Sequence, residues 1–151
     1  MGSEGRREQT TRTDQDNGLV FENIPGDRLA EVQSWFLEFA EKVVSGLVKC
    51  GLPRCKGNIM ANNPELCLSL DGWHQHFARI VTDPDHEALL KASICFDFRA
   101  LYGKASLVDD LWAKLLRRIE HNKNFLRFLT ANMLLVGRPP IPSWASKVRS
   151  L

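Results

Sequence analysis

Apolar residues between positions 27 and 50 recur every three or four residues, which predicts one long amphipathic helix. Asp27 is suited to cap its N terminus, and Gly51 ends it. We expect this helix to pack across the back of a small sheet through one apolar stripe. The stripe consists of Leu29, Val32, Phe36, Phe39, Val43 and Leu47.

Further helices are predicted downstream by the same spacing. Asn63 is placed to cap a helix with Pro64 in its first position, and Ser106 is placed to cap a later one. The predicted helical ranges are 69–81, 87–92, 106–119 and 122–135, and the last two suggest an antiparallel hairpin. Residues 56–61 alternate partly between polar and apolar, as a short strand would, and 94–98 fit either a helix or a buried strand.

A short apolar segment, residues 19–21, follows two carboxylates one residue apart, Asp14 and Asp16. If this stretch is extended, side chains two residues apart point to the same face, with Cα atoms roughly 7 Å apart. Two converging carboxylates suit a hard divalent cation such as Mg²⁺, which often keeps substrate phosphates among its ligands. The motif alone also fits a hairpin turn, because Asn17-Gly18 is a strong turn signal.

Composition narrows the classes of function. The 151 residues are 44% hydrophobic with a net charge of +2, so they can fill a core but present no large basic field for nucleic acid. No apolar run reaches the roughly 18 residues of a membrane span. The four cysteines are typical of reduced thiols in a cytoplasmic protein. The spacing of Cys50, Cys55, His74 and His76 is unlike a zinc site.

The first twenty residues carry a family resemblance. Gly2-Ser3, a gap and then Asp14-x-Asp16 leading into an apolar segment is similar to the polymerase-β-like nucleotidyltransferase superfamily. The longer string GSEGRREQTTRTDQDNGLV resembles the nucleotidyltransferase domain of bacterial signal-transduction proteins with CBS-pair and cyclic-nucleotide-binding domains. That domain is similar to the N-terminal region of protein-PII uridylyltransferase. The resemblance continues in GLPRCKGNIMANNP (51–64) and FDFRALYG (96–103).

The resemblance implies an α+β fold: an incomplete polymerase-β-like nucleotidyltransferase core with a small sheet, followed by a mainly helical segment. We expect the core at residues 1–64, lacking its first strand because only Met1 precedes the Gly2-Ser3 turn. The helical region is expected at 65–151 and to be truncated.

The implied activity is transfer of a nucleoside monophosphate from a nucleoside triphosphate to an acceptor hydroxyl. Asp14 and Asp16 would hold two Mg²⁺ ions, Gly2 and Ser3 would bind the triphosphate, and Arg6 or Arg7 would neutralise the departing pyrophosphate. The expected acceptor is a small signalling protein. The alternatives are a nucleotide-sensing pseudoenzyme and a helical interaction module.

Superfamily members also use a third carboxylate, and two positions compete for that place. Asp97 is a carboxylate among apolar residues, for which Arg99 could equally be a simple ion-pair partner. Asn58 lies where the relatives place their third carboxylate, but it is a neutral and weaker ligand. Asp97 is therefore a candidate catalytic residue and Asn58 a candidate nucleotide ligand. If the third carboxylate is lost, the domain would bind nucleotide without transferring it.

Overall fold

The computed structural model describes residues 1–8, 10, 13–83 and 92–135. Residues 92–95 are helical. The other elements, including two short 3-10 helices labelled η, are α1 (Gly2–Gly5), β1 (Leu19–Phe21), η1 (Gly26–Arg28), α2 (Leu29–Lys49), η2 (Pro64–Leu66), β2 (Cys67–Ser69), α3 (Leu70–Thr82), α5 (Ala105–His121) and α6 (Lys123–Leu135). A two-stranded sheet among helices confirms the expected α+β class.

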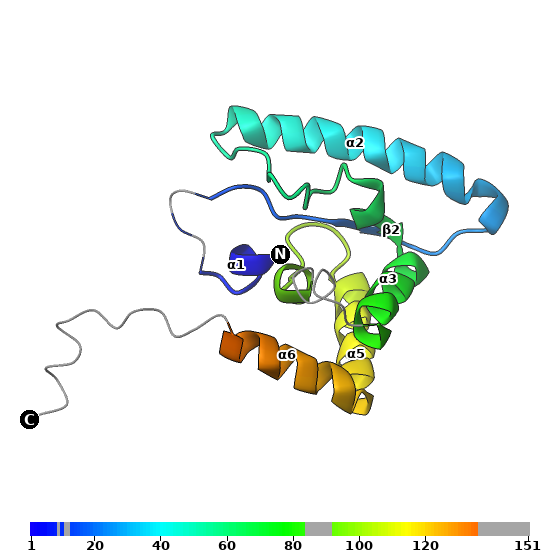
Figure 1. Cartoon of the computed structure of the whole chain (residues 1–151). Coiled ribbons are helices and arrows are strands. Elements are labelled where there is room, and N and C mark those ends of the chain that lie inside the picture. Colours follow the sequence, from blue (N-terminus) through cyan, green and yellow to red (C-terminus); the bar gives the residue numbers. More distant parts are fainter. Residues whose placement is uncertain (9, 11–12, 84–91, 136–151) are drawn as a thin grey trace, which may run out of the picture.

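The sheet is formed by β1 and β2, which run parallel with Leu19 opposite Cys67 and Phe21 opposite Ser69. An isolated parallel bridge between Gln15 and Arg54 continues the pairing toward the N terminus. Parallel neighbours need a long crossover connection, and α2 provides it here. In Figure 1, α2 lies along one side of the molecule and α6 along the opposite side, with the strands and α1 between them.

The strand expected within residues 56–61 is absent there, and the prediction was wrong. This stretch is a series of turns and bends, and β2 begins only at Cys67. Hydrogen bonds to Asn17 explain the difference. The Asn17 backbone N–H donates to Ile59 O at 3.1 Å, and its side-chain Oδ1 accepts from the Ala61 N–H at 2.8 Å. A side-chain amide thus takes the place of a regular strand ladder.

Helix α2 has the expected length but buries a different face. Ala40 and Val44 are the residues that it buries fully, whereas Phe39 and Val43 are 45% and 41% exposed. Leu29 is exposed as well. A sheet of two short strands covers only a narrow strip of the helix, and part of that strip is polar.

Two contacts from α2 to the sheet show what that strip contains. Phe36 stacks on Phe21 of β1 with ring centroids 4.9 Å apart. Gln33 Nε2 donates to the carbonyl of Cys67 at 2.9 Å, so a polar side chain faces the end of the sheet. The prediction therefore overestimated the apolar contact between α2 and the sheet. Phe39 instead stacks with the exposed Trp35, with ring centroids 6.1 Å apart.

The main core lies between α3, α5, α6 and residues 92–95. Its fully buried members are Leu66, Trp73, Phe77, Ile80, Val81, Ala92, Cys95, Leu111, Leu115 and Phe125. The predicted cap at Asn63 is confirmed, because its Oδ1 accepts from Glu65 N–H at 3.0 Å. Ser69 also caps α3, a role that was not predicted, and its Oγ accepts from Gly72 N–H at 3.1 Å. Helix α5 begins at Ala105, so Ser106 lies inside its first turn and is not its cap.

The segment that could have been a helix or a strand is helical up to Cys95 and then bends at Phe96 and Asp97. The expected helix over 87–92 falls almost wholly on residues 84–91, which lie outside the described residues. Within the described residues, none of the helices combines the length and apolar character needed to cross a bilayer.

Helices α5 and α6 do not form the expected antiparallel hairpin, because α6 runs across the end of α5 rather than back along it (Figure 1). Asn122 forms the corner between the two helices: its Oδ1 accepts from Phe125 N–H at 3.0 Å, and its Nδ2 donates to Val81 O at 2.8 Å.

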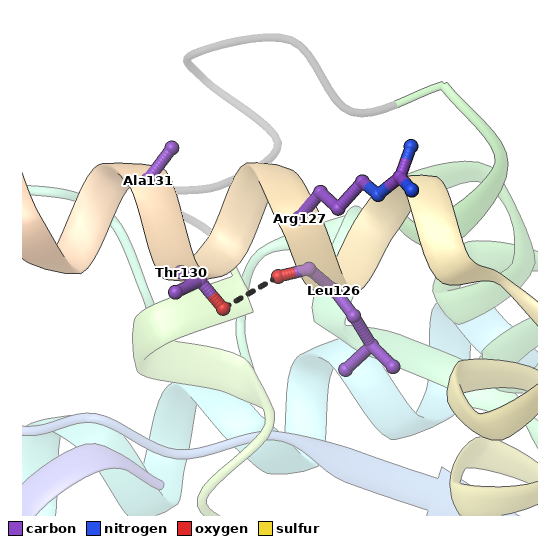
Figure 2. A pocket seen from close by; sticks show the side chains of 4 residues that line it. All are labelled: Leu126, Arg127, Thr130 and Ala131. Atoms are coloured by element: carbon purple, nitrogen blue, oxygen red, sulfur yellow. Dashed lines mark hydrogen bonds between the residues drawn. The ribbon is translucent and has the colours of Figure 1, made fainter.

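A surface pocket with a volume of about 400 Å³ lies on α6. Figure 2 shows the side chains that line it. It is lined by Leu126, Arg127, Thr130 and Ala131.

Replacing Gln15 with alanine tests the bridge between the 14–16 segment and the 52–54 segment. Gln15 is only 3% exposed, and its Nε2 donates to Leu52 O at 2.8 Å and to Val44 O at 3.2 Å. We expect Gln15→Ala to lower the free energy of unfolding by about 2–3 kcal/mol in urea, through unsatisfied carbonyls and a cavity. The exposed Lys42→Ala control should stay within about 0.5 kcal/mol. Equal stability of Gln15→Ala and wild type would contradict this role.

Candidate functional site

The orientation of Gln15 determines where its two acidic neighbours point. Its backbone N–H donates to Pro53 O at 3.1 Å, and its side chain is buried against the end of α2. Because side chains alternate along an extended chain, Asp14 and Asp16 face the opposite side together. Both are partly exposed. The structure thus brings the two predicted carboxylates together.

A third side chain joins the carboxylates. One ligand atom each from Asp14, Asp16 and Cys55 lie within 4.8 Å of one another, and all three residues are half-buried. Cys55 follows Arg54, the residue that pairs with Gln15 across the isolated bridge. Sequence reasoning did not join Cys55 to the carboxylates, because their proximity depends on a parallel pairing between segments about forty residues apart.

The environment of Cys55 raises the pKa of its thiol. Burial is the main cause, and a hydrogen bond to the Asp16 carboxylate acts in the same direction. Backbone N–H groups of Ile59 and Gly57 partly oppose these effects by hydrogen bonding to the sulfur. The thiol therefore keeps its proton at neutral pH when no cation is bound.

The Gly2-Ser3 segment lies against the same carboxylates, but as a single helical turn, α1, rather than an open turn. A Cβ added to Gly2 would lie 3.4 Å from Asp16 Oδ2, and Gly2 has a φ of +55°. At the other end of α1, a Cβ on Gly5 would lie only 2.0 Å from Asp97 O. The two glycines thus let α1 fit closely between Asp16 and the chain after Cys95.

A cavity of about 600 Å³, a volume typical of small-molecule sites, opens beside Asp14, whereas Asp16 and Cys55 do not line it. Ser3 and Asp14 both line it, with Thr10 and Thr13 adding hydroxyl groups. The other lining residues are Glu8, Gly51 and Pro53. Hydroxyl groups and a carboxylate from α1 and the extended segment therefore share one open space.

The arginines and the acidic residues near α1 are paired differently from the prediction. Asp97 forms an ion pair with Arg6, which also contacts Glu8 Oε2 at 2.8 Å. Arg99 instead pairs with Glu4, so the expected Asp97–Arg99 pair was wrong. The reason is that α1 lies against residues 97–99 and provides partners of both signs.

The remaining predicted residues lie at the margins of the site. Arg7 is exposed and has a left-handed φ of 60°. Asn58 has a φ of 56° in the turn after Cys55, where its N–H donates to Cys55 O at 3.1 Å and its carbonyl accepts from Asn63 Nδ2 at 3.0 Å. Within the part of the chain described, Asp97 does not belong to the group formed by the two carboxylates and Cys55. Of the other residues considered for zinc, Cys50 is exposed, and His74 Nε2 lies 2.8 Å from Asp110 Oδ2.

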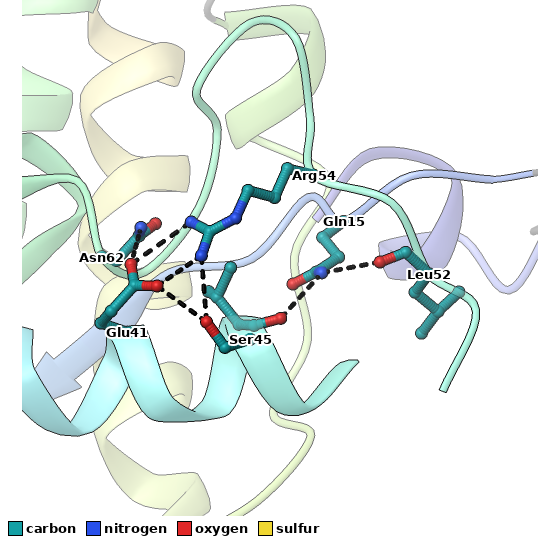
Figure 3. A network of polar contacts seen from close by, with 7 residues as sticks. Gln15, Glu41, Ser45, Leu52, Arg54 and Asn62 are labelled. Atoms are coloured by element: carbon teal, nitrogen blue, oxygen red, sulfur yellow. Dashed lines mark hydrogen bonds and ion pairs between the residues drawn. The ribbon is translucent and has the colours of Figure 1, made fainter. Parts of the chain in front are cut away.

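A polar network attaches the loop that carries Cys55 to α2 (Figure 3). Arg54 pairs with Glu41 and donates to Ser45 Oγ at 3.0 Å, and Asn62 Nδ2 donates to Glu41 Oε2 at 2.7 Å. Hydrogen bonds from Arg54, then from Ser45 and Asn62, lower the pKa of Glu41 to about 2. One α2 carboxylate thus holds both ends of the 54–62 loop.

Two converging carboxylates, next to a cavity lined with hydroxyl groups, define a site suited to a divalent cation and a phosphorylated ligand. The chain belongs to the family described as Putative nucleotidyltransferase DUF294, whose model matches residues 1–87. It has no significant match among curated proteins or among solved structures. The matched range contains Ser3, Asp14, Asp16 and Cys55, whereas Asp97 lies beyond it. The family supports a nucleotidyltransferase enzyme that uses a nucleoside triphosphate and a divalent metal.

The Glu41 network predicts a pH-dependent contribution to stability. Because the folded-state pKa of Glu41 is depressed from 4.5 to about 2, the contribution is complete above about pH 4.5 and is lost as the pH falls toward 2. We expect Glu41→Gln to lower the thermal midpoint by a few degrees at pH 6, a modest effect because the pair is exposed. The difference from wild type should shrink between pH 4.5 and pH 2. A constant difference across this range in thermal scans would contradict the assignment.

Proposed function

We propose that this protein is a metal-dependent nucleotidyltransferase that moves a nucleoside monophosphate from a nucleoside triphosphate to an acceptor hydroxyl. Membership of the nucleotidyltransferase family supports the reaction class. The single observation that carries the proposal is the convergence of Asp14 and Asp16, with Asp14 and Ser3 lining the same cavity. Two converging carboxylates, one of them in the wall of an open cavity, supply the metal ligands that metal-assisted phosphoryl chemistry requires.

The donor set fits a divalent cation, because two neighbouring carboxylates carry more negative charge than the Met1 ammonium beside Asp16 balances. Within the described residues, neither Asp14 nor Asp16 forms a salt bridge with a basic side chain. We propose that these two residues hold the divalent metal, for which the sequence resemblance alone implies two Mg²⁺ ions. When bound, the metal supplies charge neutralisation for the triphosphate and activation of the attacking hydroxyl.

The protein groups around the carboxylates would orient the triphosphate. Ser3 would donate its hydroxyl to a phosphate oxygen, and Gly2 leaves room for the close approach of the backbone to Asp16. Thr10 and Thr13 line the same space and extend the set of hydroxyl groups. Positioning of this kind accounts for most of a protein's contribution to phosphoryl transfer.

Arg6 is the cation best placed to meet the pyrophosphate, because α1 carries it on the same short turn as Ser3. Its pairing with Asp97 supports a positioning role for that carboxylate, which would hold the guanidinium at the edge of α1. Asp97 as a third catalytic carboxylate is the competing proposal. Arg7 and Asn58 remain candidate nucleotide ligands with less support, since both lie away from the carboxylate pair.

The biological setting follows from the sequence resemblance. We propose a uridylyltransferase-like enzyme of bacterial signalling, with a small signalling protein as acceptor and CBS and cyclic-nucleotide-binding domains as associated regions. A cytoplasmic location is supported by the cysteines, all four of which lie in the described part of the chain without forming a disulfide.

A second candidate function is nucleotide sensing without transfer. The observation that favours it is the identity of the third group beside the carboxylates, which is the protonated thiol of Cys55. A protonated thiol is a poorer proton acceptor than the carboxylate that superfamily members use. Such a domain would bind a triphosphate and leave it intact.

Asp14→Asn tests the proposed enzyme most simply. We expect metal-dependent pyrophosphate release from UTP or ATP to fall by about 100-fold or more, because the metal loses a charged ligand at the reacting phosphate. The thermal midpoint should stay within a few degrees, since Asp14 is half-buried and forms no salt bridge with the residues that the structure describes. The exposed Asp109→Asn variant is the matched control and should keep full activity.

The same assay separates the two candidate functions. Triphosphate binding by calorimetry with no pyrophosphate release from the wild type would favour the sensor. Undiminished release by Asp14→Asn would remove the carboxylate pair from the proposed site.

A further inference from the structure

We propose that Cys55 is a third metal ligand, so that the site of the proposed function selects a borderline divalent ion such as Zn²⁺ or Co²⁺ over Mg²⁺. The inference deepens the proposed function and rests on the same site, but it concerns the identity of the metal rather than the reaction. It starts from the three ligand atoms of Asp14, Asp16 and Cys55, which all lie within 4.8 Å of one another.

The spacing of these atoms fits one ion. A tetrahedral zinc with metal–oxygen and metal–sulfur distances of about 2.0 and 2.3 Å holds such ligand atoms about 3.3 to 3.5 Å apart. Side-chain rotations that bring the three ligand atoms about 1 Å closer together are therefore sufficient to form the site. The two aspartates are half-buried and the cysteine is too, so one side of the ion would remain open to water or a phosphate oxygen.

The backbone around the group is already held in place. The Asp14–Asp16 segment is bridged to Arg54 through Gln15, whose N–H donates to Pro53 O at 3.1 Å. On the other side of Cys55, its carbonyl accepts from the Asn58 N–H at 3.1 Å. The thiol thus reaches the carboxylates from a separate segment that is fixed against them, which is the preorganisation that a metal site needs.

Charge provides an independent reason to expect a cation at this point. The other acidic residues around α1 have basic side-chain partners: Glu4 pairs with Arg99, and Glu8 and Asp97 share Arg6. Among the described residues, Asp14 and Asp16 form no salt bridge with an arginine or lysine, and the ammonium group of Met1, which donates to the Asp16 carbonyl at 2.6 Å, is the one positive group recorded beside them. Two carboxylates beside one ammonium group keep net negative charge, and because they are partly withdrawn from water this charge favours binding of a cation.

The sulfur determines which cation binds best. Mg²⁺ is a hard ion that takes oxygen ligands and dehydrates reluctantly, so a thiolate contributes little to its binding. Zn²⁺ and Co²⁺ accept mixed sulfur and oxygen ligands. On binding, Cys55 forms a sulfur–metal bond, its S–H bond breaks, and the proton is released to solvent.

Cobalt titration of the full chain provides a readout that does not depend on nucleotide turnover. We expect Co²⁺ to produce a thiolate-to-metal charge-transfer band that saturates near one equivalent. Cys55→Ser should lose this band and bind Co²⁺ at least about tenfold more weakly. Cys50→Ser is the matched control, because Cys50 is exposed at the end of α2, and its band should equal that of the wild type.

Two further measurements use the wild-type protein, so their results do not depend on whether a variant folds. Mg²⁺ in large excess should fail to displace Co²⁺ from the wild type. In the unmodified protein, Zn²⁺ should slow alkylation of Cys55, read by mass spectrometry, while alkylation of Cys50 continues unchanged. A band that persists in Cys55→Ser, or equal alkylation of Cys55 with and without Zn²⁺, would overturn the proposal.

The outcomes distinguish this inference from the proposed function. A cobalt band that requires Cys55, in a protein that releases no pyrophosphate, would leave the metal site standing and remove the transferase activity. Pyrophosphate release supported by Mg²⁺, without any cobalt band, would do the reverse.

Discussion

The buried amide of Gln15 is the contact on which the rest of the site depends. It hydrogen-bonds the carbonyls of Val44 and Leu52, and so ties the extended N-terminal segment to both the end of α2 and the chain that follows it. Because Gln15 points inward, its acidic neighbours point outward together. Because it also draws in residues 52–54, the thiol of Cys55 arrives beside them. The buried side chain of Gln15 thus determines where the side chains of Asp14, Asp16 and Cys55 lie.

A second constraint is the close fit of α1. Glycines at both ends of this single turn allow it to lie against Asp16 on one side and Asp97 on the other. Ion pairs from Arg6 and Arg99 then connect it with the residues after Cys95. The hydroxyl of Ser3 is consequently held at the edge of the cavity that Asp14 lines. A short segment with little secondary structure of its own is positioned by contacts distant in sequence.

The sequence predicted the parts of this arrangement that depend on local rules. The two-residue period places Asp14 and Asp16 on one face, and the cap at Asn63 follows from a hydrogen bond within two residues. Helix lengths also follow from spacing, as α2 and α3 show. These features require no knowledge of which segments meet.

The features that sequence reasoning missed depend on long-range pairing. Cys55 joins the carboxylates because Gln15 pairs in parallel with Arg54, on the other side of the α2 crossover. The buried face of α2 differs from its apolar stripe: Ala40 and Val44 are buried, with Gln15 bonded to the Val44 carbonyl, whereas Phe39 and Val43 stay exposed. Asp97 and Arg99 take their partners from α1, ninety residues earlier, rather than from each other.

The most direct test of the account is a crystal of the protein grown with Co²⁺ and a non-hydrolysable nucleoside triphosphate analogue, measured at the cobalt absorption edge. The account predicts an anomalous peak in contact with the carboxylates of Asp14 and Asp16, with the triphosphate in the cavity beside Ser3. An ion and nucleotide bound elsewhere, with the two carboxylates turned to opposite sides of the chain, would contradict it.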